Sequence, residues 1–189
     1  GGDDLNRVVA RDTRAALSSG LTSTRQYGVH GEARERDVSV FVESYGPPPD
    51  MVIFGAVDFT GALVKVAKVL GYRVTVCDAR PPFATYLRFP DADEVVVGWP
   101  DAYLAKVGDG LGSRDAVCVL THDPKFDVPA VTAALDTGVG YLGAMGSRRA
   151  HADRLARLEA AGIDATRLRR LMPPIGLDLG APPPEEPPV

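Results

Sequence analysis

Two short segments of the chain combine residue types that could bind an anion or move a proton. Residues 121–125 read Thr-His-Asp-Pro-Lys. His122 is the candidate catalytic residue because an imidazole titrates near neutral pH. Thr121 and Lys125 are candidate ligand-binding residues. This density of polar groups favours a function, although Asp-Pro is also an ordinary turn signal.

The second segment, residues 143–149, reads Gly-Ala-Met-Gly-Ser-Arg-Arg. Gly146 allows a turn, Ser147 is predicted to cap a helix, and Arg148 and Arg149 follow. Backbone N–H groups at a helix start, the helix dipole and guanidinium groups together suit a phosphate or a carboxylate. We predict that these four residues bind the anionic part of a cofactor. The alternative is a capped helix whose arginines face solvent.

Residues 51–78 contain the structural unit that must position these segments. An apolar run at 51–54 predicts a buried strand, and apolar residues at 63, 66, 67 and 70 predict one stripe of a helix. Gly71 is expected to end that helix. A second apolar run at 74–77 predicts another strand, which ends on Asp78. Such a β-α-β unit places a nucleotide over the ends of its strands.

The loop after the first strand departs from the dinucleotide-binding fingerprint. Gly55 is present, but Val57 and Thr60 stand where that fingerprint has its second and third glycines. The methyl groups of Val57 would fill the space that a pyrophosphate needs. Asp58 is predicted to be the helix N-cap and would repel a phosphate. The pattern therefore favours a capped strand-helix turn over pyrophosphate binding.

Asp78 lies 23 residues after Gly55, close to the spacing of an acid that binds a ribose. Arg80 follows two residues later, so a surface ion pair is an equally good reading. We keep Gly55 and Asp78 as candidate cofactor-binding residues.

The fold class is predicted to be α/β, with a Rossmann-like parallel sheet that has helices on both faces. Further strands are expected at 94–97, 115–121 and 139–143, and further helices at 101–107, 127–135, 147–161 and 165–171. We expect a small α+β piece at 1–46 (helix 5–17, strands 24–28 and 38–43), a proline-rich linker at 47–50, the Rossmann-like domain at 51–180 and a disordered tail at 181–189.

Composition excludes several classes of protein. The net charge of −4 argues against a sequence-independent nucleic-acid binder. No apolar run approaches 18 residues, so no membrane span is expected. Cys77 and Cys118 lie in apolar runs and are predicted to be buried core thiols. No cysteine and histidine spacing fits a metal site. Without an export signal, we expect a cytoplasmic protein.

Four motifs resemble those of the XdhC/CoxI family, whose members are accessory factors of xanthine dehydrogenase and carbon monoxide dehydrogenase. The motifs are residues 88–92 (RFPDA), 120–125 (LTHDPK), 141–149 (YLGAMGSRR) and 174–180 (PIGLDLG). The resemblance implies a Rossmann-like domain. It also implies binding of the molybdenum cofactor (molybdopterin) and its maturation or delivery to a molybdenum hydroxylase.

The chain departs from that family at two places. The family's first loop usually begins Gly-Ala-Gly-His, where this chain has Val57 and Asp58 in the last two positions. The family's amino-terminal domain usually carries a cysteine after Gly-Gly, a candidate sulfur ligand, where this chain has Asp3.

Two other functions remain open from the sequence. One is an NAD(P)-dependent oxidoreductase, in which Asp78 would favour NAD because a carboxylate repels a 2′-phosphate. The other is a degenerate, non-catalytic relative that binds proteins. A homo-oligomer is expected for the leading function as for these two, because the small amino-terminal piece needs a partner surface.

Overall fold

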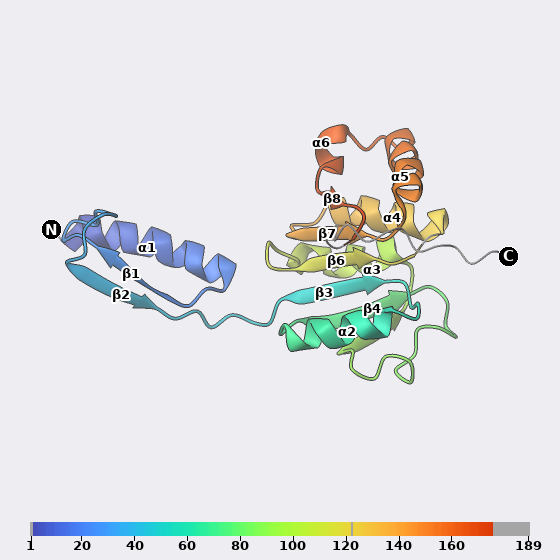
Figure 1. The fold of residues 1–189 in the computed structure, drawn as a ribbon, viewed down its shortest axis with the longest axis horizontal. Coiled ribbons are helices and arrows are strands. Elements are labelled where there is room, and N and C mark those ends of the chain that lie inside the picture. Colours follow the sequence, from blue (N-terminus) through green and yellow to red (C-terminus); the bar gives the residue numbers. More distant parts are fainter. Residues whose placement is uncertain (1, 122, 176–189) are drawn as a thin grey trace.

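The computed structural model describes residues 2–121 and 123–175 (Figure 1). The chain begins with a helix, α1 (Gly2–Ser19), beside a two-stranded antiparallel sheet of β1 (Ser23–Tyr27) and β2 (Val38–Val42). This α+β unit buries few side chains, among them Ala16, Tyr27 and Val42. The segment with Pro47, Pro48 and Pro49 then leads into the second sheet.

The rest of the described chain alternates strands and helices, as its hydrophobic pattern predicts. The elements are β3 (Asp50–Phe54), α2 (Thr60–Val69), β4 (Arg73–Asp78), β5 (Glu94–Val97), α3 (Pro100–Val107), a 3₁₀ turn (Gly108–Gly110), β6 (Ala116–Val119), α4 (Pro124–Leu135), β7 (Tyr141–Ala144), α5 (Arg148–Ala160), α6 (Ala165–Leu168) and β8 (Leu171–Met172). None of the helices within residues 2–121 and 123–175 is long and apolar enough to cross a lipid bilayer.

The second sheet is entirely parallel, with the strand order β5-β4-β3-β6-β7-β8. This order confirms the predicted Rossmann-like α/β class. The prediction was wrong at the sixth strand, β8, because it continued a helix through residues 165–171. Only two residues pair there, Leu171 with Leu142 and Met172 with Gly143. A strand of two residues is too short to show the alternation of apolar and polar residues by which strands are predicted.

Helices cover both faces of the parallel sheet. Val52 and Phe54 of β3 point into a core with α3, α4 and α5, whereas Met51 and Ile53 point into a core with α2. The two-residue alternation of a strand produces this division, and both sets are apolar because both faces are covered. Gly71 has a φ of +84° just after α2, which confirms the predicted helix stop.

The backbones that follow β3 and β6 approach closely at the point where the order of strand addition reverses. After β3 the chain builds β4 and β5 on one side, then returns to place β6 on the other. Gly55 has a φ of +115°, and a Cβ atom there would lie 3.0 Å from the carbonyl carbon of Leu120 and 3.1 Å from the nitrogen of Thr121. A side chain at residue 55 would therefore collide with backbone that cannot rotate away.

A buried ion pair joins α4 to α5. The Nε atom of Arg154 donates to Asp127 at 3.0 Å, and both side chains are at most 3% exposed. Nη2 of Arg154 donates to the carbonyl oxygen of Met145 at 2.7 Å, which fixes the turn between β7 and α5. Nη1 of Arg154 and Oδ1 of Asp127 have no hydrogen-bond partner in the described structure. Arg154 thus holds the two helices that follow β6 and β7.

Replacing Gly55 by alanine is expected to lower the free energy of unfolding by about 2 kcal/mol or more, because of the positive φ and the backbone contact. Gly61→Ala is the matched control, since its Cβ would meet nothing within 4 Å. Alanine at residue 61, inside α2, should raise the free energy of unfolding by no more than about 1 kcal/mol. Urea unfolding of both variants measures the difference. Equal effects would contradict the proposed steric constraint.

Replacing Arg154 by methionine is expected to cost about 3–5 kcal/mol of unfolding free energy, because Asp127 is left as an unpaired buried charge. Arg154→Met combined with Asp127→Leu should recover most of that loss. Arg167→Met, which breaks a more exposed pair with Asp136, should cost about 1 kcal/mol or less. Chemical unfolding of the three variants measures these losses of unfolding free energy. A smaller loss for Arg154→Met than for Arg167→Met would contradict the prediction.

Candidate functional site

The carboxyl ends of four adjacent strands form one edge of the parallel sheet, where ligands bind in folds of this class. Three of the predicted site residues meet there. Gly55 follows β3, Asp78 ends β4, and Thr121 comes two residues after β6; all three line one small cavity. Lys125 lies in the first turn of α4, and residues 146–149 follow β7 on the next strand end.

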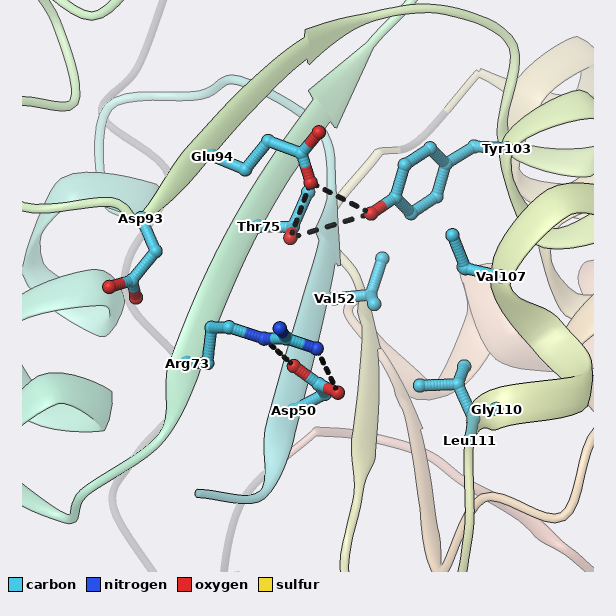
Figure 2. Close-up of a pocket in the computed structure, with 10 residues that line it drawn as sticks. All are labelled: Asp50, Val52, Arg73, Thr75, Asp93, Glu94, Tyr103, Val107, Gly110 and Leu111. Carbon is cyan, nitrogen blue, oxygen red and sulfur yellow. Dashed lines mark hydrogen bonds and ion pairs between the residues drawn. The ribbon is translucent and has the colours of Figure 1, made fainter. Parts of the chain in front are cut away.

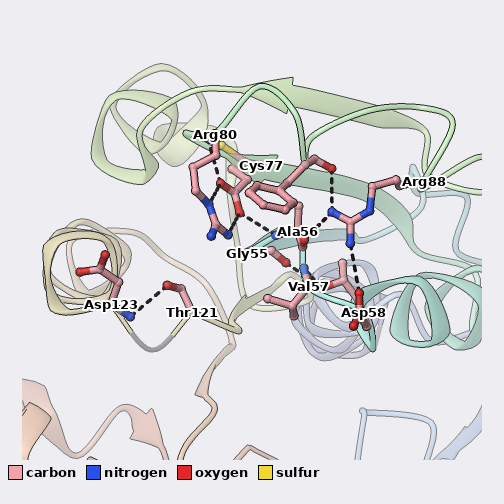
Figure 3. A network of polar contacts seen from close by, with 12 residues as sticks. Gly55, Ala56, Val57, Asp58, Cys77, Arg80, Arg88, Thr121 and Asp123 are labelled. Carbon is pink, nitrogen blue, oxygen red and sulfur yellow. Dashed lines mark hydrogen bonds and ion pairs between the residues drawn. The ribbon is translucent and has the colours of Figure 1, made fainter.

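The loop after β3 satisfies its own polar groups. The hydroxyl group of Thr60 is fully buried, donates to the carbonyl oxygen of Gly55 at 2.7 Å and accepts from the N–H of Val57 at 3.3 Å. The N–H of Ala56 donates to Asp78 at 2.8 Å. Two of the backbone donors that a phosphate would need are therefore engaged within the protein (Figure 3).

The prediction that Asp58 caps α2 was wrong. The N-cap residue is Phe59, whose side chain makes no capping hydrogen bond. Asp58 is fully exposed and lies 3.3 Å from Nη2 of Arg88 (Figure 3). Thr60, the first residue of α2, bonds the preceding loop at Gly55 and Val57, so its hydroxyl group satisfies the loop without capping the helix.

Arg88 closes the outer side of the same loop. Its Nη1 donates to the carbonyl oxygen of Ala56 at 2.9 Å, and its guanidinium lies 5.4 Å from the ring centre of Phe83. The guanidinium of Arg80 lies 4.5 Å from the centre of the same ring. Reasoning from single residues missed Arg88 as part of the site, because 30 residues separate it from Asp58. Its place in the RFPDA motif was the available signal.

The carboxylate of Asp78 is held by internal donors. It accepts from Nε and Nη2 of Arg80 at 2.9 and 2.8 Å, and from the N–H of Ala56. Burial raises the pKa of Asp78, but the hydrogen bonds from Arg80 and Ala56 outweigh burial, so the pKa lies below its usual range. Asp78 is therefore ionised and paired with Arg80. A ribose hydroxyl group would have to share the carboxylate oxygens with Arg80 and Ala56.

The segment at 121–125 begins a helix. Asp123 is the N-cap of α4 and accepts from the N–H of Lys125 at 3.1 Å, while its own N–H donates to Thr121 at 3.2 Å. The predicted start of this helix at 127 was three residues late, although Asp-Pro followed by an apolar run is a helix-start signal. His122 lies outside the described residues, so its catalytic role stays a prediction.

The turn before α5 has the predicted local structure. Gly146 has a φ of +146°, and Ser147 is the N-cap, accepting from the N–H of Ala150 at 3.2 Å. The side chains of Arg148 and Arg149 are exposed. The buried guanidinium of Arg154 lies beneath this turn, 3.6 Å from where a Cβ on residue 146 would sit. The segment 176–180, part of the fourth motif, lies outside the described residues.

Cys77 and Cys118 are confirmed as buried, free thiols. Burial raises the pKa of each thiol to about 12, so neither supplies a thiolate at neutral pH. Within residues 2–121 and 123–175, no group of three histidine, cysteine or acidic side chains is arranged to hold a metal ion.

A larger pocket of about 420 Å³ opens at the opposite edge of the sheet (Figure 2). Its lining includes the Asp50–Arg73 ion pair and the hydroxyl groups of Thr75 and Tyr103. These residues stand at the amino ends of β3 and β4 or on α3. Because ligands of open parallel sheets bind beyond the carboxyl ends, the smaller cavity and its neighbouring turns are the candidate functional site.

The lowered pKa of Asp78 means that its carboxylate stabilises the fold above the usual aspartate pKa, and that this stabilisation is lost as the pH falls below it. Asp78→Asn should therefore cost about 1.5–3 kcal/mol at pH 7, and the gap to the wild type should narrow below about pH 4. Urea unfolding of both proteins between pH 7 and pH 3 measures this difference in unfolding free energy. Exposed Asp91→Asn is the control and should stay within about 0.5 kcal/mol. A gap that is constant with pH would contradict the assignment.

Comparison with known proteins identifies relatives of this chain. The chain is 28% identical over 152 residues to a probable xanthine dehydrogenase subunit of Bacillus subtilis, covering 80% of this chain and 43% of that protein. It is 31% identical over 77 residues to the molybdenum cofactor insertion chaperone PaoD of Escherichia coli, covering 41% of this chain and 24% of that protein. The chain thus spans less than half the length of these relatives.

A solved structure has the same fold. The crystal structure of a xanthine dehydrogenase from Bacillus halodurans superposes with a TM-score of 0.60 at 24% identity, over 97% of this chain and 61% of that one. The sequence pattern of the XdhC Rossmann domain matches residues 51–187. That match includes the parallel sheet from Met51 onward, the turn before α5 and the loops described above, and the chain therefore belongs to the XdhC family.

Proposed function

We propose that this protein binds the molybdenum cofactor and serves the maturation of a molybdenum hydroxylase of the xanthine dehydrogenase type. The observation that carries the proposal is the turn before α5, where Ser147 caps the helix and Arg148 and Arg149 follow at the ligand-binding edge of the sheet. Membership of the XdhC family supports it, as does the similarity to a molybdenum cofactor insertion chaperone.

The donors at this edge fit the phosphate of a pterin cofactor. The first N–H groups of a helix lack intrahelical partners, and the helix dipole favours a negative charge at that end. Arg148 and Arg149 add guanidinium groups that form charge-assisted hydrogen bonds with phosphate. Lys125, in the first turn of the neighbouring α4, adds a further positive charge. Gly146, Ser147 and Thr121 would shape the turn and its rim.

The described residues fit the metal end of the cofactor less well. The family resemblance implies a sulfur ligand, but Asp3 stands at that position, and Cys77 and Cys118 are buried protonated thiols inside strands. We therefore propose that these residues hold the cofactor by its phosphate and pterin. When bound, the cofactor supplies the redox-active metal that the partner hydroxylase uses, and this domain contributes binding and orientation.

Isolated molybdenum cofactor, titrated anaerobically into the intact protein in a calorimeter, is expected to bind. Arg148→Ala and Arg149→Ala should each weaken binding at least tenfold, or about 1.4 kcal/mol, because each removes a charge-assisted contact. Arg169→Ala is the matched control: it removes an exposed arginine of equal charge just after α6. That variant should bind within about twofold of the wild type, since exposed distant charges are screened.

No binding by the intact protein would overturn the proposal, and equal weakening by the control would reduce it to a non-specific charge effect. Saturable binding of NADH, without cofactor binding, would instead favour the oxidoreductase. Recovery of a molybdenum hydroxylase in pull-downs with every loop variant, again without cofactor binding, would favour a protein-binding relative that has lost the site.

A further inference from the structure

Trp99 is the only tryptophan of the chain and stands at the ligand-binding edge of the sheet. It follows β5 as the N-cap residue of α3 and remains 49% exposed. Its ring centre lies 5.0 Å from that of Phe126, with the ring planes 44° apart. A tryptophan that is half exposed at a binding edge presents a large apolar face that the fold itself does not cover.

The backbone under Trp99 is held firmly. The N–H of Gly98 donates to the carbonyl oxygen of Asp78 at 3.1 Å, and the thiol of Cys77 donates to the carbonyl oxygen of Gly98 at 3.4 Å. The carbonyl oxygen of Trp99 accepts from the N–H of Tyr103 inside α3 at 2.9 Å. The backbone that carries the indole is therefore fixed, which lowers the entropic cost of binding.

Polar groups converge beside this aromatic pair. Phe126 and Pro100, the neighbour of Trp99, line the same small cavity as Asp78 and Thr121. The ammonium group of Lys125 lies 4.7 Å from the ring centre of Phe126. Phe126, Asp78 and Thr121 are each at most 9% exposed, so the half-exposed indole of Trp99, with Lys125 beside the Phe126 that supports it, is the part of this cluster that a flat ligand can reach.

We propose that Trp99, supported by the buried ring of Phe126, forms a stacking platform for a planar bicyclic nitrogen heterocycle, the ring type shared by purines and pterins. Stacking on an aromatic side chain needs only a π-face, and the ammonium group of Lys125 can contact the edge of the ring. The phosphate loop beside it is closed by Val57 and buried Thr60. The site therefore takes the ring without drawing affinity from a pyrophosphate.

For a pterin ligand this platform deepens the proposed function and rests on it, but it uses none of the residues of the turn before α5 and can therefore be tested separately. Because Trp99 is the sole tryptophan, the tryptophan fluorescence of the full chain, excited selectively over that of the tyrosines, reports from this site alone. Adenosine, NAD and pterin are titrated, with ribose 5-phosphate as the ring-free control and free N-acetyltryptophanamide as the correction for light absorption. We expect saturable quenching by adenosine, pterin or both, none by ribose 5-phosphate, and no tighter binding of NAD than of adenosine.

Variants measured by calorimetry separate stacking from a general loss of structure. Trp99→Ala should weaken binding of the quenching ring compound at least tenfold, whereas Trp99→Phe should stay within about threefold because a phenyl ring still stacks. Phe41→Ala, which removes an exposed aromatic side chain from β2, is the control and should leave binding unchanged. Arg148→Ala should also leave adenosine binding unchanged, since adenosine has no phosphate.

Quenching by pterin alone would identify the cofactor's own ring as the ligand, and quenching by adenosine alone would identify a nucleotide base; both support the platform. The proposal is overturned if no ring compound quenches the fluorescence, if ribose 5-phosphate quenches equally, or if Trp99→Ala binds as tightly as the wild type. If Arg148→Ala loses cofactor binding but still binds adenosine, the result supports both the phosphate site before α5 and a separate stacking platform at Trp99.

Discussion

The close approach of two backbones at the centre of the sheet is the constraint on which the structure depends. Gly55 passes the carbonyl group of Leu120 and the N–H of Thr121 at distances that leave no room for a side chain. This contact lies where the strand order reverses, between β3 and β6. It brings the loops of both halves of the sheet together, and those loops carry the polar residues from which a binding site can be built.

The same region shows how a Rossmann-like fold can lose its phosphate loop without losing its shape. In a dinucleotide-binding loop, backbone N–H groups remain available to a pyrophosphate. Here Thr60 engages the N–H of Val57, Asp78 engages that of Ala56, and Arg88 engages the carbonyl oxygen of Ala56. Internal hydrogen bonds replace the ligand, because buried polar groups need partners. In our proposal, anion binding takes place instead at the turn before α5.

That second turn is supported from below by Arg154. Its guanidinium links Asp127 of α4 to the carbonyl oxygen of Met145, so the helices that begin at Asp123 and Ser147 are held together. A buried ion pair contributes little net stability compared with apolar packing, but it fixes geometry when its hydrogen bonds are directional. The platform of Trp99 and Phe126 depends on the same α4, which gives both proposed sites one rigid support.

The sequence by itself determined the alternation of strands and helices after residue 50, the stop at Gly71, the cap at Ser147, the burial of Cys77 and Cys118, and the resemblance to the XdhC family. Each of these follows from local chemistry: periodic apolar residues, a glycine that accepts positive φ, or a hydroxyl group beside free N–H groups. Local signals of this kind need no knowledge of distant partners.

Only the tertiary structure decided which partners the polar residues take. The sequence could not show that Thr60 rather than Asp58 completes the first loop, that Arg88 reaches back 30 residues to Asp58, or that Leu171 and Met172 pair with β7 as a sixth strand. It also left two readings of Asp78, of which the structure contains the ion pair with Arg80. The physical reason is that hydrogen bonds and ion pairs depend on distances between atoms, and the folding of the whole sheet sets those distances.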